Sequence, residues 1–205
     1  MNLDRKSSRW LLWLTAAAAL VLTAILLVLF ALVGHKDEAS ASAVDKKGPQ
    51  VLLFRHALTD QSQSDADPKA RGSCDQQRNL SAEGVAQAER IGEALQNLTI
   101  TRVYASPFCR TLQTAEAMDV GPVQQTDALL STTAAADADE QADILAAGQD
   151  LIDQAVQGAG VTVMVTHTQN IEALTGELVE EGDAVRLESH GDDVLSQRVV
   201  PAGDW

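Results

Sequence analysis

The sequence is poor in several residue types on which whole classes of protein depend. Two cysteines among 205 residues exclude a disulfide-dense scaffold and a cysteine-rich zinc module. Aromatic residues make up only 3%, which argues against a surface on which bases or sugar rings stack. The 15 Lys and Arg residues are outnumbered by 29 Asp and Glu, and a net charge of −14 argues against binding nucleic acid through its phosphates. Hydrophobic residues reach 45%, which excludes a chain disordered by composition.

One long stretch without any charge lies near the N-terminus, from Trp10 to Gly34. As a helix it would span roughly 37 Å, enough to cross a hydrocarbon core of about 30 Å. Arg5, Lys6 and Arg9 precede it, which predicts that residues 1–9 stay in the cytoplasm and that the rest is exported. We therefore predict a transmembrane signal-anchor helix over residues 10–34.

A cleaved secretory signal is the alternative interpretation of this stretch. The small residues Ala39 to Ala43 offer cleavage positions, although the apolar region of such a signal usually has only about 7–15 residues. No cysteine directly follows the apolar run, which excludes a lipoprotein anchor. In both interpretations the remainder faces the periplasm or another extracytoplasmic space, with residues 35–48 as a flexible stalk and residues 49–205 as one domain.

Apolar strands alternate with amphipathic helices along this domain. Apolar runs predict buried parallel strands over residues 50–54 and 161–166, and a further strand is predicted over residues 100–105. Helices are predicted over 81–95 (with Ser81 as N-cap), 106–118, 139–157 and 170–178, a short strand over 123–126, and an edge hairpin over 185–187 and 194–200. The alternation predicts a three-layer α/β/α fold with a mostly parallel central sheet.

Polar side chains follow these three strands, as Arg55-His56, Ser106-Pro107 and Thr166-His167. In parallel sheets the C-terminal strand ends share one edge, where ligands bind, so these residues are expected to meet there. Taken one by one, an Arg-His pair is typical of a surface turn and a histidine at a strand end is typically structural. A metal site from the two histidines lacks a third ligand at helical spacing.

Together these residues suit phosphate chemistry. A neutral His56 could attack phosphorus and hold the phosphoryl group covalently. Arg55 and Arg110 could pair with the phosphate oxygens through their guanidinium forks, and His167 could donate a further hydrogen bond. We expect the remaining histidines, His35 in the stalk and His190 in the hairpin turn, to lie in solvent.

At this point the sequence resembles the histidine phosphatase superfamily, also called phosphoglycerate mutase-like, in its small exported branch. The resemblance covers about residues 50–187. Its motifs are Leu52-Leu53-Phe54-Arg55-His56-Ala57, Cys74 through Asn79-Leu80-Ser81 to Gly84 and Gln87-Ala88, Ala105-Ser106-Pro107-Phe108-Cys109-Arg110-Thr111 with Gln113-Thr114-Ala115, and Val165-Thr166-His167 with Asn170-Ile171 and Leu174-Thr175-Gly176.

The resemblance implies a role for each matching residue. His56 would be the phosphorylated nucleophile, Arg55, Arg110 and His167 would complete the phosphate pocket, and neither a metal nor an organic cofactor would be needed. Arg78 is a candidate for the substrate entrance, or else a surface residue. Ala57 stands where the family usually has glycine, a departure that smaller members tolerate.

The proton donor is where the sequence departs most from the family. Many members place an acid directly after the second histidine, but this chain has Thr168 there. The other usual place lies some way after the second arginine, where Asp137, Asp139 and Glu140 stand. We take Glu140 as the candidate donor, with a solvated helix start as the alternative for all three acids.

Cys74 and Cys109 fall in two loops that we expect at the same sheet edge. An exported domain lies in an oxidising space, so we predict a disulfide between them, with two buried thiols as the alternative.

We expect the domain to hydrolyse a phosphomonoester outside the cytoplasm through a phosphohistidine. A mutase is less favoured because the domain has no room for large capping insertions. The alternative is a catalytically impaired phosphate-binding module tethered to the membrane, and a tethered acidic scaffold has little support. The acidic surface around a local cationic pocket favours a small substrate with one phosphate over a polyanion.

Overall fold

The computed structural model describes residues 49–66, 73–189 and 195–205 of the chain. The predicted cytoplasmic segment 1–9, membrane helix 10–34 and stalk 35–48 lie outside these ranges, as does the predicted hairpin turn with His190 and Gly191. None of the helices within the described ranges is long and apolar enough to span a bilayer.

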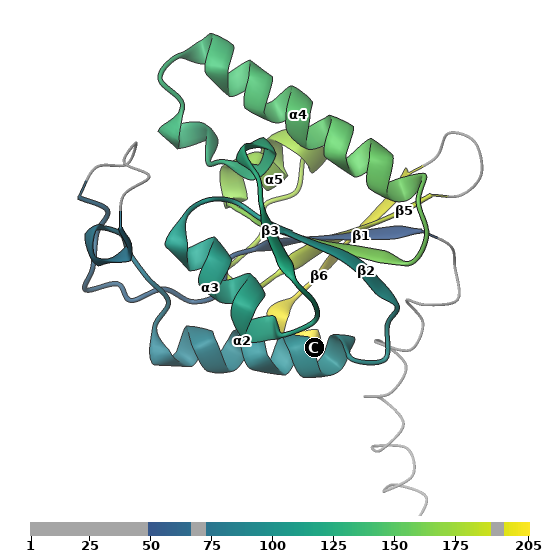
Figure 1. Cartoon of the computed structure of the whole chain (residues 1–205), viewed down its shortest axis with the longest axis horizontal. Coiled ribbons are helices and arrows are strands. Elements are labelled where there is room, and N and C mark those ends of the chain that lie inside the picture. Colours follow the sequence, from purple (N-terminus) through teal and green to yellow (C-terminus); the bar gives the residue numbers. More distant parts are fainter. Residues whose placement is uncertain (1–48, 67–72, 190–194) are drawn as a thin grey trace, which may run out of the picture. The chain divides into compact units, whose positions relative to one another are not determined.

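The centre of the domain is a six-stranded sheet in the order β3-β2-β4-β1-β5-β6 (Figure 1). The first four strands of this order pair in parallel, and β5 pairs antiparallel with β1 and β6. The mostly parallel sheet and the antiparallel pair at one edge are confirmed. The strands are β1 (Gln50–Arg55), β2 (Ile100–Ala105), β3 (Val123–Gln125), β4 (Val161–Thr166), β5 (Ala184–Ser189) and β6 (Leu195–Val200).

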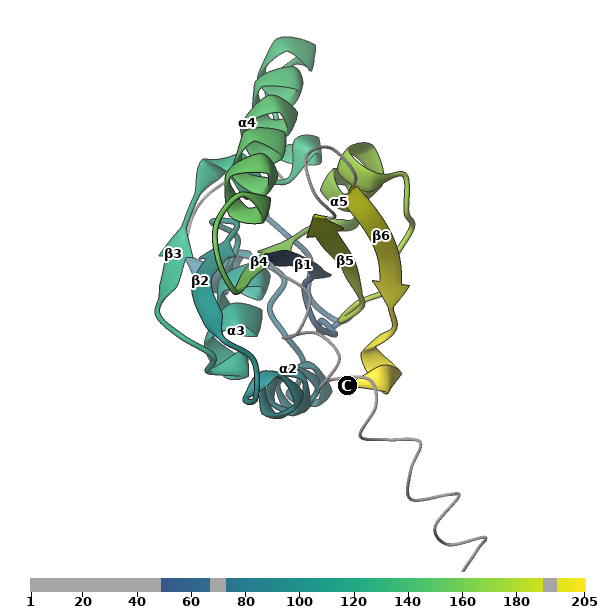
Figure 2. The ribbon, with the colours of Figure 1, turned by 90° about the vertical axis from the view of Figure 1, so that its right-hand side faces the viewer.

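Helices cover both faces of this sheet, which confirms the predicted three layers (Figure 2). They are α2 (Ala82–Leu95) and α3 (Cys109–Met118) on one face, and α4 (Ala138–Val156) and α5 (Thr168–Thr175) on the other. Successive side chains of β1 alternate between these layers: Leu52 and Phe54 belong to the core under α2 and α3, while Val51 and Leu53 belong to the core under α4 and α5. A strand buried on both faces has no polar alternation, which is why it shows as an unbroken apolar run.

Two predicted helix boundaries are wrong. The helix expected from residue 106 begins at Cys109, because the Ser106 N–H still donates to the Val165 carbonyl of the sheet and Phe108 is extended. The helix expected over 170–178 runs from Thr168 to Thr175. It ends there because Gly176 adopts the left-handed conformation (φ 77°), in which its N–H donates to the Glu172 carbonyl. The predicted N-cap is confirmed, since Ser81 Oγ accepts from the Gly84 N–H.

Glycine allows α2 to pass close to the end of α3. A Cβ atom at Gly92 would lie 1.9 Å from the carbonyl oxygen of Met118. Because α3 carries Arg110 in its first turn, this contact helps to fix the helix that bears Arg110.

Gly92→Ala should therefore force the two helices apart and lower the free energy of unfolding by about 2–3 kcal/mol, as overpacking does. Gly203→Ala is the matched control, because a Cβ there meets no atom within 4 Å. Urea denaturation of both variants measures the difference, and equal stabilities would show that α2 and α3 can adjust.

Candidate active site

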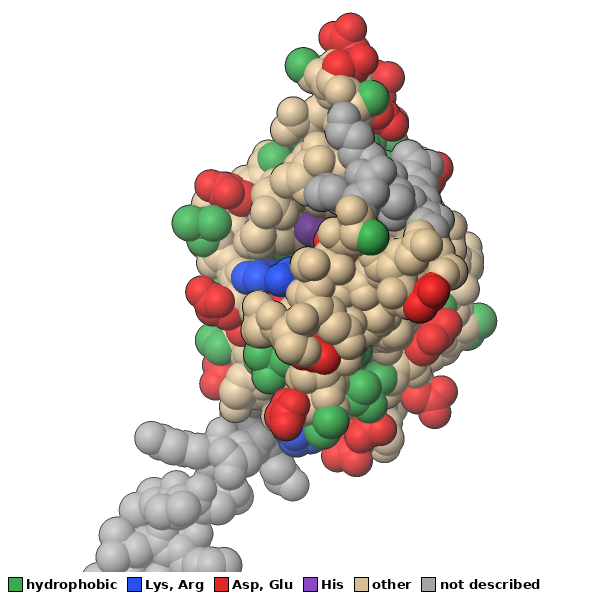
Figure 3. All heavy atoms as spheres, turned by 90° about the vertical axis from the view of Figure 1, so that its left-hand side faces the viewer, with side chains coloured by type: hydrophobic (Ala, Val, Ile, Leu, Met, Phe, Trp, Pro, Cys, Tyr) green, Lys and Arg blue, Asp and Glu red, His purple; other side chains and the backbone are tan. Residues whose placement is uncertain are grey.

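The C-terminal ends of β1, β2 and β4 bring the predicted residues together. The His56 N–H donates to the Thr166 carbonyl at 3.1 Å, which extends the parallel pairing by one residue beyond the strand. The His56 and His167 rings lie with their centroids 5.7 Å apart, and Ser106 Oγ is 3.0 Å from His167 Nε2. In Figure 3 a histidine side chain is visible in a hollow of the surface, next to basic side chains.

The His56 ring is held in one orientation by its own backbone. Nδ1 lies 3.0 Å from the carbonyl oxygen of Ala57, to which it donates when it bears the proton. The Ala57 N–H donates to Thr114 Oγ1 on α3 at 2.9 Å, and the Leu58 N–H, in the same peptide as the accepting carbonyl, donates to Gln87 Oε1 at 3.0 Å. The tautomer with hydrogen on Nδ1 leaves Nε2 with its lone pair, the form that a nucleophilic imidazole requires.

Burial keeps both histidines neutral. It lowers the pKa of His56 to about 3, and the nearby guanidinium groups of Arg110, Arg55 and Arg78 act in the same direction against the hydrogen bond to Ala57. Burial also lowers the pKa of His167 well below the ordinary range, with smaller contributions from His56 and the same arginines. Only 4% of His56 and 2% of His167 is exposed, so water does little to screen these charges.

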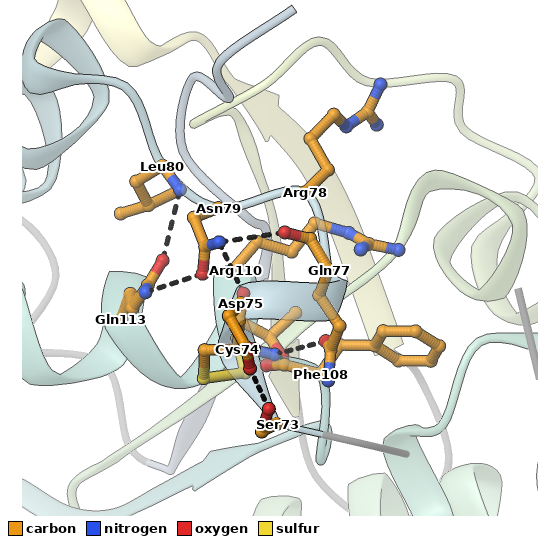
Figure 4. The surroundings of a disulfide bond; sticks show 12 residues. Ser73, Cys74, Asp75, Gln77, Arg78, Asn79, Leu80, Phe108, Arg110 and Gln113 are labelled. Carbon is orange, nitrogen blue, oxygen red and sulfur yellow. Dashed lines mark hydrogen bonds between the residues drawn. A yellow bond between two sulfur atoms is a disulfide. The ribbon is translucent and has the colours of Figure 1, made fainter. Parts of the chain in front are cut away.

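Three arginines lie close enough to His56 for their charges to act on it. Arg55, Arg78 and Arg110 each have a buried Nε atom without a hydrogen-bond partner among the described residues. Arg110 is itself 6% exposed, and its guanidinium carbon lies 4.5 Å from the centre of the Phe108 ring. Figure 4 shows the guanidinium ends of Arg78 and Arg110 on the same side, away from the disulfide. Buried donors without a protein acceptor suit an anion such as phosphate.

Cys74 and Cys109 form the predicted disulfide, with their Cα atoms 5.6 Å apart (Figure 4). The bond joins the 3-10 helix η1 (Cys74–Gln76), which precedes Arg78, to the first residue of α3, which precedes Arg110. Hydrogen bonds support the same junction: the Cys109 N–H donates to Gln77 Oε1 and Gln113 donates to Asn79. The disulfide therefore ties together the two segments that carry these arginines.

Two acidic residues of the site were missed by the sequence reasoning. Asp65 accepts hydrogen bonds from Arg110 Nη1 at 3.1 and 3.3 Å and from the Arg78 backbone N–H at 2.9 Å. Glu181 lies beside Arg55 and His56, with Oε1 3.8 Å from His56 Nδ1. Both stand in acid-rich loops, and no sequence signal separates them from the solvated acids around them.

Glu140 lies at the start of α4, where it has a structural contact. Its Oε2 accepts from the Ala136 N–H at 2.6 Å, while the Asp137 side chain caps the helix by accepting from the Glu140 N–H. Both interactions satisfy donors at a helix N-terminus. The role of Glu140 as a proton donor stays a prediction. Within the described ranges, no group of three His, Cys, Asp or Glu side chains is placed to hold a metal ion.

Residues 51–134 match the family model described as histidine phosphatase superfamily, branch 1. A search of the curated proteins finds no match. The sequence profile thus spans the strand with Arg55-His56, the disulfide-linked loop and the helix with Arg110, and it ends before the strand that leads to His167.

Several solved structures share the fold. Mycobacterial glucosyl-3-phosphoglycerate phosphatase has 18% identity and a TM-score of 0.54, covering 75% of this chain and 97% of its own. The protein histidine phosphatase SixA, solved with tungstate, has 18% identity and a TM-score of 0.52, covering 76% and 98%. The product of an open reading frame of Mycobacterium tuberculosis has 18% identity and a TM-score of 0.54, covering 72% and 95%. With the family match, these similarities show the fold of the histidine phosphatase superfamily, in its phosphoglycerate mutase-like branch 1.

Replacing Cys74 and Cys109 by serine should impair phosphate binding more than turnover, because the loop with Arg78 is then no longer bonded to α3. We expect the KM for a phosphomonoester to rise several-fold and the free energy of unfolding to fall by about 2–4 kcal/mol. Wild-type protein kept in reductant should behave like the double variant. An unchanged KM in both would show that the hydrogen bonds of this junction hold the arginines without the disulfide.

Proposed function

We propose that this chain is a phosphatase that hydrolyses a phosphomonoester through a phosphohistidine on His56. The observation that supports this most strongly is the set of three buried Nε–H donors, on Arg55, Arg78 and Arg110, around a neutral imidazole. A phosphoryl group satisfies such donors, and the charge spread over its oxygens in the transition state is what guanidinium groups stabilise. His167 completes the pocket, with its ring oriented by Ser106.

In the first step, Nε2 of His56 attacks phosphorus. The N–P bond forms as the bond to the leaving oxygen breaks, and the electron pair remains on that oxygen, which takes a proton. The imidazole keeps its hydrogen on Nδ1, bonded to the Ala57 carbonyl, so the phosphorylated ring is cationic. In the second step water attacks phosphorus and gives a proton back to the group that protonated the leaving oxygen, the N–P electron pair returns to Nε2, and inorganic phosphate leaves.

The leaving oxygen needs a general acid, for which Glu140 is our candidate. Its Oε2 already accepts a hydrogen bond from the Ala136 N–H, so the donor role requires this contact to open. The same contact supports a second candidate function, in which the domain binds a phosphate group but turns it over poorly for want of a proton donor.

An acidic domain with one cationic pocket favours a substrate of low charge. The net charge of the chain is −14, and Asp65 and Glu181 add carboxylates beside the pocket arginines. We propose a small phosphomonoester whose leaving group is uncharged, as opposed to a polyanion. The named phosphatases of this fold differ in what they act on, so the fold leaves the individual substrate open.

The proposed place of action is outside the cytoplasm. A disulfide next to the pocket supports an oxidising compartment, and the predicted membrane helix over residues 10–34 would hold the domain there. The disulfide is compatible equally with a domain released by cleavage near Ala43.

His56→Ala should abolish phosphate release, by about three orders of magnitude or more, because the variant has no nucleophile. The measurement is inorganic phosphate released from a panel of phosphomonoesters by the full-length chain. Arg102→Ala is the control, since it removes an exposed arginine of β2 away from the pocket. Phosphate release from the wild type that does not exceed that of His56→Ala on any substrate would contradict the proposal.

The pH dependence follows from the lowered pKa of His56. Because that pKa lies at about 3, the ring is neutral above roughly pH 4, and its protonation should not reduce activity between pH 5 and 7. The fall of kcat/KM at low pH (its acid limb) should instead reflect protonation of the substrate phosphate at its second pKa. Two phosphomonoesters whose second pKa values differ by about one unit should therefore show acid limbs displaced by that amount. Coincident limbs would assign the acid limb to a group of the protein.

A further inference from the structure

The loop that connects α5 to β5 forms hydrogen bonds with the C-terminal end of β1. We call residues Val179 to Asp183 the return loop. The Gly182 N–H donates to the His56 carbonyl at 3.0 Å, and the Arg55 N–H donates to the Asp183 carbonyl at the same distance. Arg55 Nη1 donates to the Val179 carbonyl at 2.9 Å. The backbone that carries the nucleophile is therefore fixed on this side by the return loop.

One carboxylate of the return loop faces this junction. Glu181 Oε1 accepts a hydrogen bond from Thr59 Oγ1 at 2.7 Å, and it lies 3.8 Å from His56 Nδ1 and 3.9 Å from Arg55 Nη2. Its side chain is only 12% exposed. The Glu181 backbone carbonyl accepts from Gln87 Nε2 at 3.0 Å, so the residue is held at both ends.

We infer that Glu181 is a positioning residue for His56, whose carboxylate balances the positive charge that the ring acquires when Nε2 takes up the phosphoryl group. The inference rests on the proposed function, because only a phosphorylated His56 has this charge. Before the reaction the ring is neutral, and the three guanidinium groups oppose any positive charge on it. During transfer the ring becomes cationic while its Nδ1–H remains bonded to Ala57.

The position of Glu181 excludes the other role that a carboxylate could have here. It lies on the Nδ1 side of the ring, whereas the phosphoryl group and the leaving oxygen are in line with Nε2 on the opposite side. Glu181 therefore cannot protonate the leaving group directly, and its effect must pass through His56. An opposite charge about 4 Å from a developing charge, in a site with little water, stabilises the charged state substantially.

The neighbouring Glu180 provides a matched control. Its carboxylate is also 3.9 Å from Arg55, but its side chain is 93% exposed, and no contact joins it to His56. Glu180→Gln and Glu181→Gln thus remove the same charge from adjacent residues of the return loop, and only the second removes it from beside the nucleophile.

The test is the pre-steady-state reaction of the full-length chain with p-nitrophenyl phosphate, followed by rapid quenching and quantification of phosphohistidine. Glu181→Gln should slow phosphoenzyme formation by about 10- to 100-fold, with KM changed by less than about twofold. Glu180→Gln should match the wild type. Glu181→Asp, which retains the charge, should recover part of the rate. Thr59→Val, which removes the hydrogen bond to Glu181, should give an intermediate rate.

Each outcome decides a separate point. Wild-type rates in Glu181→Gln would overturn the role of Glu181 and leave the phosphohistidine mechanism intact. Equal losses in the Glu180 and Glu181 variants would also overturn it, because the effect would then be one of general surface charge. Absence of phosphohistidine in the wild type would overturn the proposed function itself. If Glu181→Gln does not fold, the Thr59→Val rate decides, and a wild-type value there counts against Glu181.

Discussion

The parallel pairing of β1 with β4 is the constraint on which the rest of the site depends. It sets Arg55 opposite Thr166, so the residues that follow each strand, His56 and His167, come to lie side by side. The same register lets the His56 N–H continue the ladder to the Thr166 carbonyl. A shift of one residue in either strand would turn the side chains of that strand to the opposite face of the sheet, and its histidine would no longer lie beside the other.

A second feature of the site is that its positive charge lies on arginines, whereas its two histidines are neutral. Guanidinium groups keep their charge at any relevant pH, whereas burial holds the two histidines neutral. The site therefore combines positive charge on its arginines with neutral imidazole rings. Two acidic residues lie within this arrangement. Asp65 accepts from Arg110 Nη1, whose Nε has no acceptor among the described residues, and Glu181 lies beside Nδ1 of His56.

The parts predicted well from the sequence are those determined by residues close together in the chain. The strands 100–105 and 161–166 have their predicted bounds, and the second is buried over its whole length, which its short apolar and β-branched run reflects. Histidines and arginines that follow such strands could be assigned to one edge from the fold class alone. The start of α3 was misplaced by three residues, because the sheet hydrogen bond of Ser106 depends on a partner far away in the sequence. Asp65 and Glu181 were missed for the same reason, since only the paths of their loops distinguish them from other acids.

The bond between Cys74 and Cys109 also affects the order in which parts of the site form after synthesis. A disulfide forms by oxidation of two thiols after synthesis, so the loop with Arg78 is bonded to the helix with Arg110 later than the peptide chain itself is made. The backbone hydrogen bonds around His56 need no such step. The surroundings of His56 and the junction between Arg78 and Arg110 are thus completed by different kinds of chemistry, and formation of the second can lag behind folding of the first.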